Sequence, residues 1–197
     1  MNKEGLAHLI NNKVTSYREY RIKYAELVID DKSLFLHLLE LSFDETNEAS
    51  IKVSWVLDFV SREKLEWFYP HLDYFSDNIS NVKHHSIVRP MARICELLAK
   101  AHNSKKNIEI DQYLTKNHID KIIETGFDWM ISDQKVAVKA YTMESLFLFG
   151  KEIDWVHDEL KLILVQEISG GSPAYKARAK KILKWIEKFE KRRKTED

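Results

Sequence analysis

The sequence predicts an all-α protein, an α-α superhelix of about four to five helix pairs that forms one domain over residues 1–197. Two observations support this prediction. Glycine and proline are rare, with 5 and 3 in 197 residues, while 44% of the residues are hydrophobic and 31% are charged, which favours helices over sheets. In addition, one pattern recurs about every 40 residues, as expected for helix pairs that bury their apolar sides only by stacking.

The recurring pattern is a helix that begins with small or apolar residues followed by a lysine or arginine. The basic residues are 37, 50 and 37 positions apart, and the polar stretch 101–117 accounts for the longer interval as a loop. The unit 128–150 has the clearest limits, because it turns at Ser132 and ends at Gly150. We expect the basic residues at matching places in successive units: Lys52, Arg89, Lys139 and Lys176.

The remaining helices are predicted from apolar residues at three- and four-residue spacing. They cover the segments 6–10, 17–28, 34–39, 65–75, 119–127 and 156–168. Residues that cap helix N-termini precede several of them. The expected caps are Thr15 or Ser16, Asn117, Asp154 and, before Pro173, Ser172.

Five aromatic residues fall within nine positions of the 65–75 segment. They cannot all face one core if the segment is an ordinary helix, so part of the cluster is predicted to contact a partner. The predicted contact residues are Trp67, Phe68, Tyr69, Tyr74 and Phe75.

The charge of the chain is unevenly distributed, although its net charge is zero. Residues 176–194 contain ten lysines or arginines and two glutamates, whereas the preceding part has an acidic excess. We therefore predict a basic face on the last helix and a basic tail from about residue 188. The candidate residues of this face are Lys176, Lys180, Lys184, Lys188, Arg192 and Arg193.

Asp133 and Lys139, six positions apart with Val138 before the lysine, resemble the acidic and basic pair of HEAT repeats. The chain is also similar to short bacterial helical-repeat proteins without an established role, some of which are labelled adenylosuccinate lyase. The HEAT resemblance implies a non-catalytic scaffold that binds another macromolecule by shape and surface. A protein is the expected partner, given the mixed charge and the surplus aromatic residues.

Two other functions remain open at this level. Nucleic acid could bind through the basic C-terminal helix, and Trp55 with Asp58 resembles the aromatic and carboxylate pair of HEAT-like DNA alkylation repair glycosylases. Residues 171–178 faintly resemble the signature loop of the fumarase and adenylosuccinate lyase superfamily, although the terminal Asn-Pro of that loop is missing. Lyase activity is therefore a further alternative.

No cofactor or metal site is expected, because none of the eight histidines forms a pair with the spacing of metal ligands on one helix face. The single cysteine, Cys95, lies among apolar residues and is interpreted as a buried, inert thiol. One cysteine agrees with a cytoplasmic location. No apolar run approaches the roughly 20 residues that cross a membrane.

Overall fold

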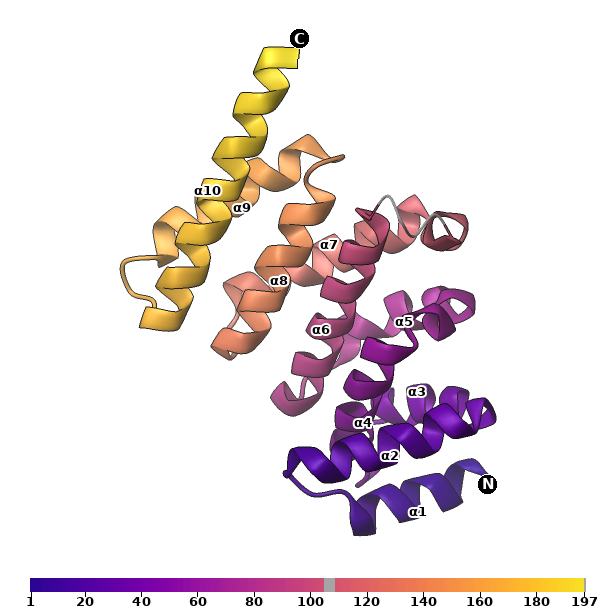
Figure 1. The fold of residues 1–197 in the computed structure, drawn as a ribbon. Coiled ribbons are helices and arrows are strands. Elements are labelled where there is room, and N and C mark those ends of the chain that lie inside the picture. Colours follow the sequence, from indigo (N-terminus) through magenta and orange to yellow (C-terminus); the bar gives the residue numbers. More distant parts are fainter. Residues whose placement is uncertain (105–108, 197) are drawn as a thin grey trace.

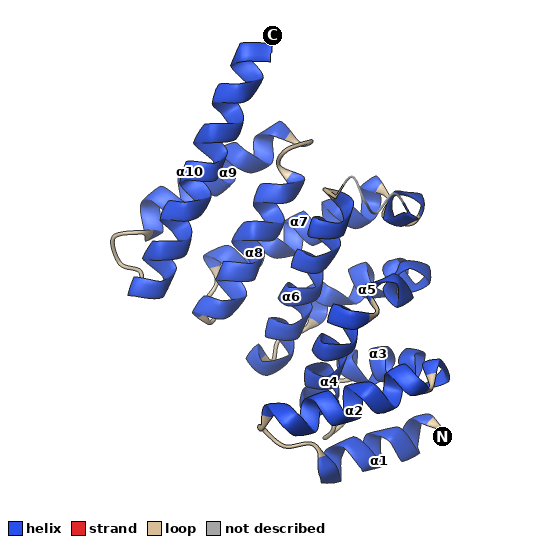
Figure 2. Cartoon of the chain, in the orientation of Figure 1, coloured by secondary structure: helices blue, strands red, loops and turns tan. Residues whose placement is uncertain are grey.

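The computed structural model describes residues 1–104 and 109–196, and in this part of the chain it contains ten α-helices, four short 3₁₀-helices and no strand (Figure 2). The predicted fold class is therefore confirmed. In chain order the α-helices are α1 (Lys3–Lys13), α2 (Arg18–Asp30), α3 (Phe35–Phe43), α4 (Ser50–Glu63), α5 (Leu72–Asn78), α6 (His85–His102), α7 (Lys116–Ile131), α8 (Val136–Phe149), α9 (Asp154–Glu167) and α10 (Pro173–Glu196). The 3₁₀-helices are η1 (Lys32–Leu34), η2 (Leu65–His71), η3 (Ile79–Asn81) and η4 (Glu109–Gln112).

The helices form two layers, which we call even and odd after their numbers. In the even layer α2, α4, α6, α8 and α10 pack side by side in that order (Figure 1). In the odd layer α1 packs on α3, and α7 packs on both α5 and α9. The five consecutive helix pairs thus build an elongated stack in which each pair packs mainly on its neighbours, as in a solenoid.

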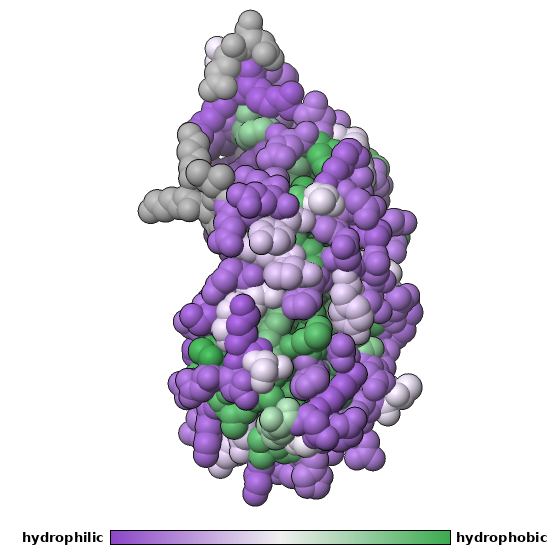
Figure 3. All heavy atoms as spheres, turned by 90° about the vertical axis from the view of Figure 1, so that its right-hand side faces the viewer, coloured by the Kyte–Doolittle hydropathy of each residue, from purple (hydrophilic) through white to green (hydrophobic). Residues whose placement is uncertain are grey.

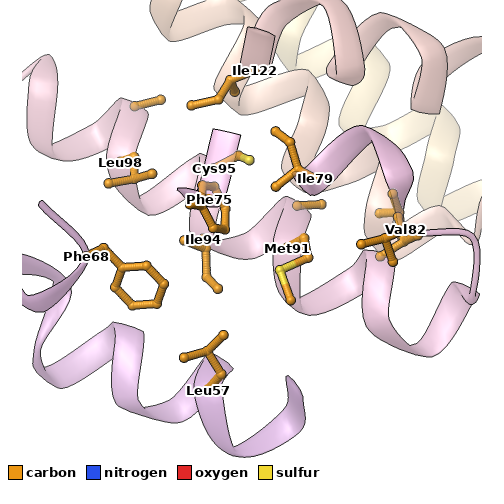
Figure 4. Close-up of a cluster of buried hydrophobic side chains, with 14 of the residues drawn as sticks. Leu57, Phe68, Phe75, Ile79, Val82, Met91, Ile94, Cys95, Leu98 and Ile122 are labelled. Atoms are coloured by element: carbon orange, nitrogen blue, oxygen red, sulfur yellow. The ribbon is translucent and has the colours of Figure 1, made fainter. Parts of the chain in front are cut away.

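A continuous apolar core runs between the layers. Figure 4 shows its central part, where Ile94 and Leu98 of α6 lie near Phe75 of α5 and Leu57 of α4. All four side chains are fully buried. The side of the molecule seen in Figure 3 is mostly hydrophilic, with hydrophobic residues visible among the hydrophilic ones. The helical stripes read from the sequence therefore point inward, and their burial supplies the main stabilising free energy.

The aromatic cluster of residues 67–75 lies largely inside this core, and it fills the junction between two successive units. The Phe68 ring packs edge-on against Phe35 of α3 at 5.0 Å, and the Phe75 ring packs in the same way against Phe43 at 5.9 Å. Phe68, Tyr69 and Phe75 are buried, so they are not available to a partner, contrary to the expectation. Only Trp67 and Tyr74 keep accessible surface.

The reason is that residues 65–71 form the 3₁₀-helix η2 instead of an α-helix. Pro70, which lacks a backbone N–H, lies in this stretch and α5 begins two residues later. The tighter winding and the change of helix type place Phe68 and Tyr69 inside although they are neighbours in sequence.

Some predicted helix caps are confirmed and others are wrong. The Ser172 hydroxyl accepts the Tyr175 N–H at 3.3 Å, as expected before Pro173. The cap of α7 is Thr115 and not Asn117, because Thr115 and the His118 ring form a reciprocal capping box. Tyr17 precedes α2 and Ile153 precedes α9 at the cap position, each without a side-chain cap, so Thr15, Ser16 and Asp154 do not act as predicted.

The four recurring basic residues all fall within the first five positions of even helices, at matching levels of the stack. Their contacts nevertheless differ. Lys52 of α4 reaches back to the backbone carbonyl of Asn11, whereas Lys139 of α8 reaches forward to Glu167 at 3.1 Å. The place of the basic residue in its helix therefore recurs, but the group that it contacts differs from unit to unit. The predicted loop 101–117 begins within α6 and contains η4, and residues 105–108 lie outside the described part of the chain.

Replacing Phe75 by alanine should destabilise the protein by about 3–5 kcal/mol, because a fully buried ring is removed from a packed core. The neighbouring Tyr74→Ala variant serves as the control, since Tyr74 is 38% exposed and contributes one edge-on contact to Phe43. We expect about 1 kcal/mol for this control. Urea unfolding followed by circular dichroism measures both, and equal losses would contradict the assignment of Phe75 to the core.

Candidate functional site

The outer side of α10 presents a stripe of lysines. Lys180, Lys184 and Lys188 recur every four residues, so they follow one side of the helix. All three are exposed, and the opposite side of the helix buries Ala179 and Ile182 in the core. An open hollow of about 570 Å³ lies along this side, lined by Lys184, Glu187, Lys188, Lys191, Arg192 and Thr195.

Most of the lysine stripe carries uncompensated charge. Within residues 1–104 and 109–196, no carboxylate lies within ion-pair distance of Lys180, Lys184 or Lys188. Lys176 is half-buried, so it contributes less surface than predicted. Arg192 is exposed, while Arg193 contacts Asp154 of α9 and thereby ties the end of α10 to the stack. The helix continues through residue 188 to Glu196, and its last turns extend past the neighbouring helices (Figure 1).

A network of ion pairs crosses the even layer. The carboxylate of Glu96 on α6 is 1% exposed and pairs with Arg93 at 2.7 Å and with Lys100 at 2.9 Å. Lys100 also pairs with Glu144 of α8 at 2.9 Å, and Arg178 of α10 pairs with Glu144 at 2.8 Å. Three successive even helices are thus joined by charge-assisted hydrogen bonds, which satisfy a buried carboxylate that would otherwise be costly.

The network determines the ionisation of Glu144. Burial raises its pKa, but the hydrogen bond and charge of Lys100, with the charges of Arg178 and Lys181, outweigh burial and hold the pKa below its ordinary value. For Lys100 burial has the opposite effect and lowers the pKa. The hydrogen bonds of Lys100 to Glu144 and Glu96 outweigh burial, so its pKa is raised overall. Both groups are therefore charged near neutral pH.

A second polar cluster lies where α2 meets α4. The Arg21 guanidinium lies 4.2 Å from the centre of the Trp55 ring, and Arg62 donates to both carboxylate oxygens of Asp58 at 3.2 and 2.6 Å. Asp58 is 7% exposed and Trp55 is half-buried. Trp55 and Asp58, which the sequence analysis noted as a possible pair, thus belong to one cluster. Each of them already has a partner, because Arg21 covers the Trp55 ring and Arg62 forms an ion pair with Asp58.

Comparison with protein-family models finds a match to the HEAT repeat domain over residues 15–186. This match covers most of the chain. The chain belongs to the HEAT repeat family. A search of curated proteins found no significant match, and neither did a search of solved structures. HEAT repeat domains are generally binding or scaffold modules, so the fold and the family agree with a binding role.

The contacts between successive HEAT units were not foreseen from the sequence. The Glu45 carboxylate accepts the backbone N–H groups of Lys83 and His84 at 3.1 and 2.7 Å, which joins the turn after α3 to the segment before α6. His85 and Gln134 join the next two turns at 3.1 Å. Each junction uses different residue types, which explains why the sequence shows no repeated acidic position.

Of the acidic and basic pair that suggested HEAT repeats, Asp133 and Lys139, only the lysine forms an ion pair with the described residues. Lys139 pairs with Glu167, as described above, but Asp133 is exposed and takes part in no ion pair with the described residues. The ladder of repeated aspartates and basic residues is therefore replaced here by the individual contacts of Glu45, Gln134 and Glu167.

Other reactive side chains have structural positions. Cys95 is buried and burial raises the pKa of its thiol, which keeps it protonated and inert. His84 caps α6 through the Ser86 N–H, and His118 belongs to the capping box of α7. Among the described residues no group of three or more His, Cys, Asp or Glu side chains could hold a metal ion. A search of the same residues finds no helix with the length and apolar character of a membrane span.

Replacing Glu144 by glutamine should reduce the amount by which the free energy of unfolding falls when the pH is lowered. The folded pKa of Glu144 is lowered, so its stabilisation is complete above the ordinary value of 4.5 and is lost as the pH falls through the folded value. We expect a loss of about 2 kcal/mol at neutral pH, because Lys100 and Arg178 lose a charged partner. We also expect a smaller further loss below about pH 4.5 than in the wild type.

Thermal unfolding at a series of pH values measures this effect. Glu159→Gln is the matched control, because Glu159 is an exposed glutamate of α9, and it should keep the wild-type response. An identical pH response in the Glu144→Gln protein would contradict the role assigned to the ion-pair network.

Proposed function

We propose that this HEAT repeat protein is a non-catalytic scaffold that binds a protein partner through the lysine stripe of α10. The observation that carries the proposal is that Lys180, Lys184 and Lys188 lie on an exposed helix side without an ion pair to the described residues. Lys191 and Arg192 extend the same surface, although Lys191 is paired with Glu187 at 2.5 Å.

The matching partner is an acidic protein segment. Positive side chains on one side of a rigid helix attract carboxylates from a distance and orient the encounter. The α10 helix is held at this position by packing on α8 and α9, including the ion pair between Lys161 of α9 and Glu190 at 2.6 Å. The aromatic residues Trp67 and Tyr74, which keep accessible surface, are proposed as a second contact area on the odd layer.

Replacing Lys180, Lys184 and Lys188 together by glutamate should abolish capture of the partner, because three attractive charges become repulsive. Affinity capture followed by mass spectrometry compares the wild type with this variant. The matched control replaces three exposed lysines elsewhere, Lys13, Lys23 and Lys135, by glutamate and should retain capture. If the α10 variant is folded by circular dichroism and captures the same proteins as the wild type, the stripe is not the binding surface.

Nucleic acid is a second candidate partner, favoured by the run of four basic residues 191–194 at the end of α10. A gel shift at two salt concentrations tests it. Binding to phosphates releases counterions, so affinity should fall by about tenfold or more between about 50 mM and about 200 mM salt. Absence of a shift at the lower concentration would exclude this candidate without affecting the protein-capture experiment.

A further inference from the structure

The arginines of the chain are segregated in one layer. All eight lie on even helices, two on α2, one on α4, two on α6 and three on α10, and none on an odd helix. Lysines occur in both layers. Arginine differs from lysine in its flat, permanently charged group with several N–H donors. We call the surface that six of them form the arginine face: Arg18, Arg21, Arg62, Arg89, Arg93 and Arg178.

Aromatic rings support several of these cations. Arg21 of α2 lies over Trp55 of α4, and Arg93 of α6 lies over Tyr141 of α8 with 5.0 Å between the guanidinium carbon and the ring centre. In both cases the arginine of one even helix covers a ring of the next. Near the C-terminal end Lys181 of α10 lies 4.6 Å from the centre of a tryptophan ring of its own helix. Contacts between a cation and a ring therefore recur at several places in the even layer.

The donors of these arginines are incompletely used. The Nε atoms of Arg21 and Arg93 are buried without a hydrogen-bond acceptor among the described residues. The Nη2 atom of Arg21 donates to the Ser16 carbonyl at 2.8 Å, and Nη1 of Arg93 donates to Glu96. Each guanidinium is thus held in a fixed position, and because its Nε atom is buried, a ligand could meet only the part of the half-buried side chain that stays accessible.

Three arginines of the arginine face form ion pairs with the described residues, and three do not. Arg62, Arg93 and Arg178 each pair with a carboxylate of the network or of Asp58. Arg18 and Arg89 form no ion pair within the described residues, and neither does Arg21. Burial lowers the pKa of Arg21 and repulsion from the charge of Arg89 lowers it further, while the charge of Asp58 offsets part of this effect. An anionic ligand would relieve this repulsion.

We propose that the arginine face binds single-stranded nucleic acid. A single strand offers phosphates to the unpaired guanidinium groups and flat bases that stack on ring-supported cations. Neighbouring helices of one layer are about 8–10 Å apart, so a strand that crosses the layer meets a new basic side chain at successive helices. An acidic peptide would neutralise the charge but has no flat groups to stack. The proposal rests on the nucleic-acid candidate above and moves its site from the C-terminal end of α10 to the arginine face.

Fluorescence anisotropy with a labelled oligothymidylate of about 16 nucleotides tests the proposal. The Arg21→Gln/Arg93→Gln variant should bind at least about tenfold more weakly than the wild type, because it loses two cations and two stacking planes. Arg21→Lys/Arg93→Lys keeps the charge and loses the planes, so its affinity should lie between the two. The matched control, Lys13→Gln/Lys116→Gln, removes two charges from exposed sites in the odd layer and should bind like the wild type.

Three results would overturn the proposal, with folding of each variant verified by circular dichroism. If the lysine-to-glutamate variant of α10 loses the oligonucleotide while the arginine variants keep it, nucleic acid binds only at α10. If the wild type does not bind the oligonucleotide, both nucleic-acid proposals fall and the protein-capture result stands alone. If polyglutamate binds with the same affinity and the same dependence on Arg21 and Arg93, the face recognises acidic chains in general. If the Arg21→Gln/Arg93→Gln protein is unfolded, the Arg21→Lys/Arg93→Lys protein provides the test. An affinity of this lysine variant equal to that of the wild type would contradict stacking on the arginines.

Discussion

The fold of this protein depends on one constraint, that a pair of short amphipathic helices buries its apolar side only against another pair. Every unit therefore needs its neighbours, and the contacts at each junction determine how the units are placed. The rings of Phe68 and Phe75 fill the junction between α3 and α5. Glu96 and Glu144 hold α6, α8 and α10 together on the outer side of the even layer. The binding surfaces are by-products of this arrangement, because stacking aligns equivalent sides of successive helices.

Stacking also separates the charges. The even helices carry all the arginines and the lysine-rich α10, whereas α9 contains four acidic residues and one lysine. A sequence of zero net charge thus folds into an object whose positive excess is concentrated on α10 and, to a smaller extent, on α6, and a partner encounters the local field instead of the total charge. The lysine stripe and the arginine face are two regions of the even layer that differ in chemistry, since one presents compact point charges and the other presents planar groups, several of which lie over aromatic rings.

The fold could be predicted from the sequence because hydrophobic spacing and repeat length are local signals. The helices around Lys52, Arg89, Lys139 and Lys176 lie where the pattern indicated. The aromatic cluster could not be placed correctly, since α-helical spacing does not apply to η2, and neighbouring Phe68 and Tyr69 are both buried there. The arginine face was also missed. Its residues are spread over 161 positions, from Arg18 to Arg178, and they meet only when helices of one layer are aligned.

The junctions described above have a consequence for how such an array can evolve or be engineered. Glu45 joins one pair of turns through backbone amides, His85 and Gln134 join the next, and Lys139 and Glu167 the one after. A helix pair moved to another position in the array would not find complementary side chains at its new junctions. The junctions therefore define the order of the units in this solenoid, and copying one module would not reproduce matching contacts in the way that it does in consensus arrays.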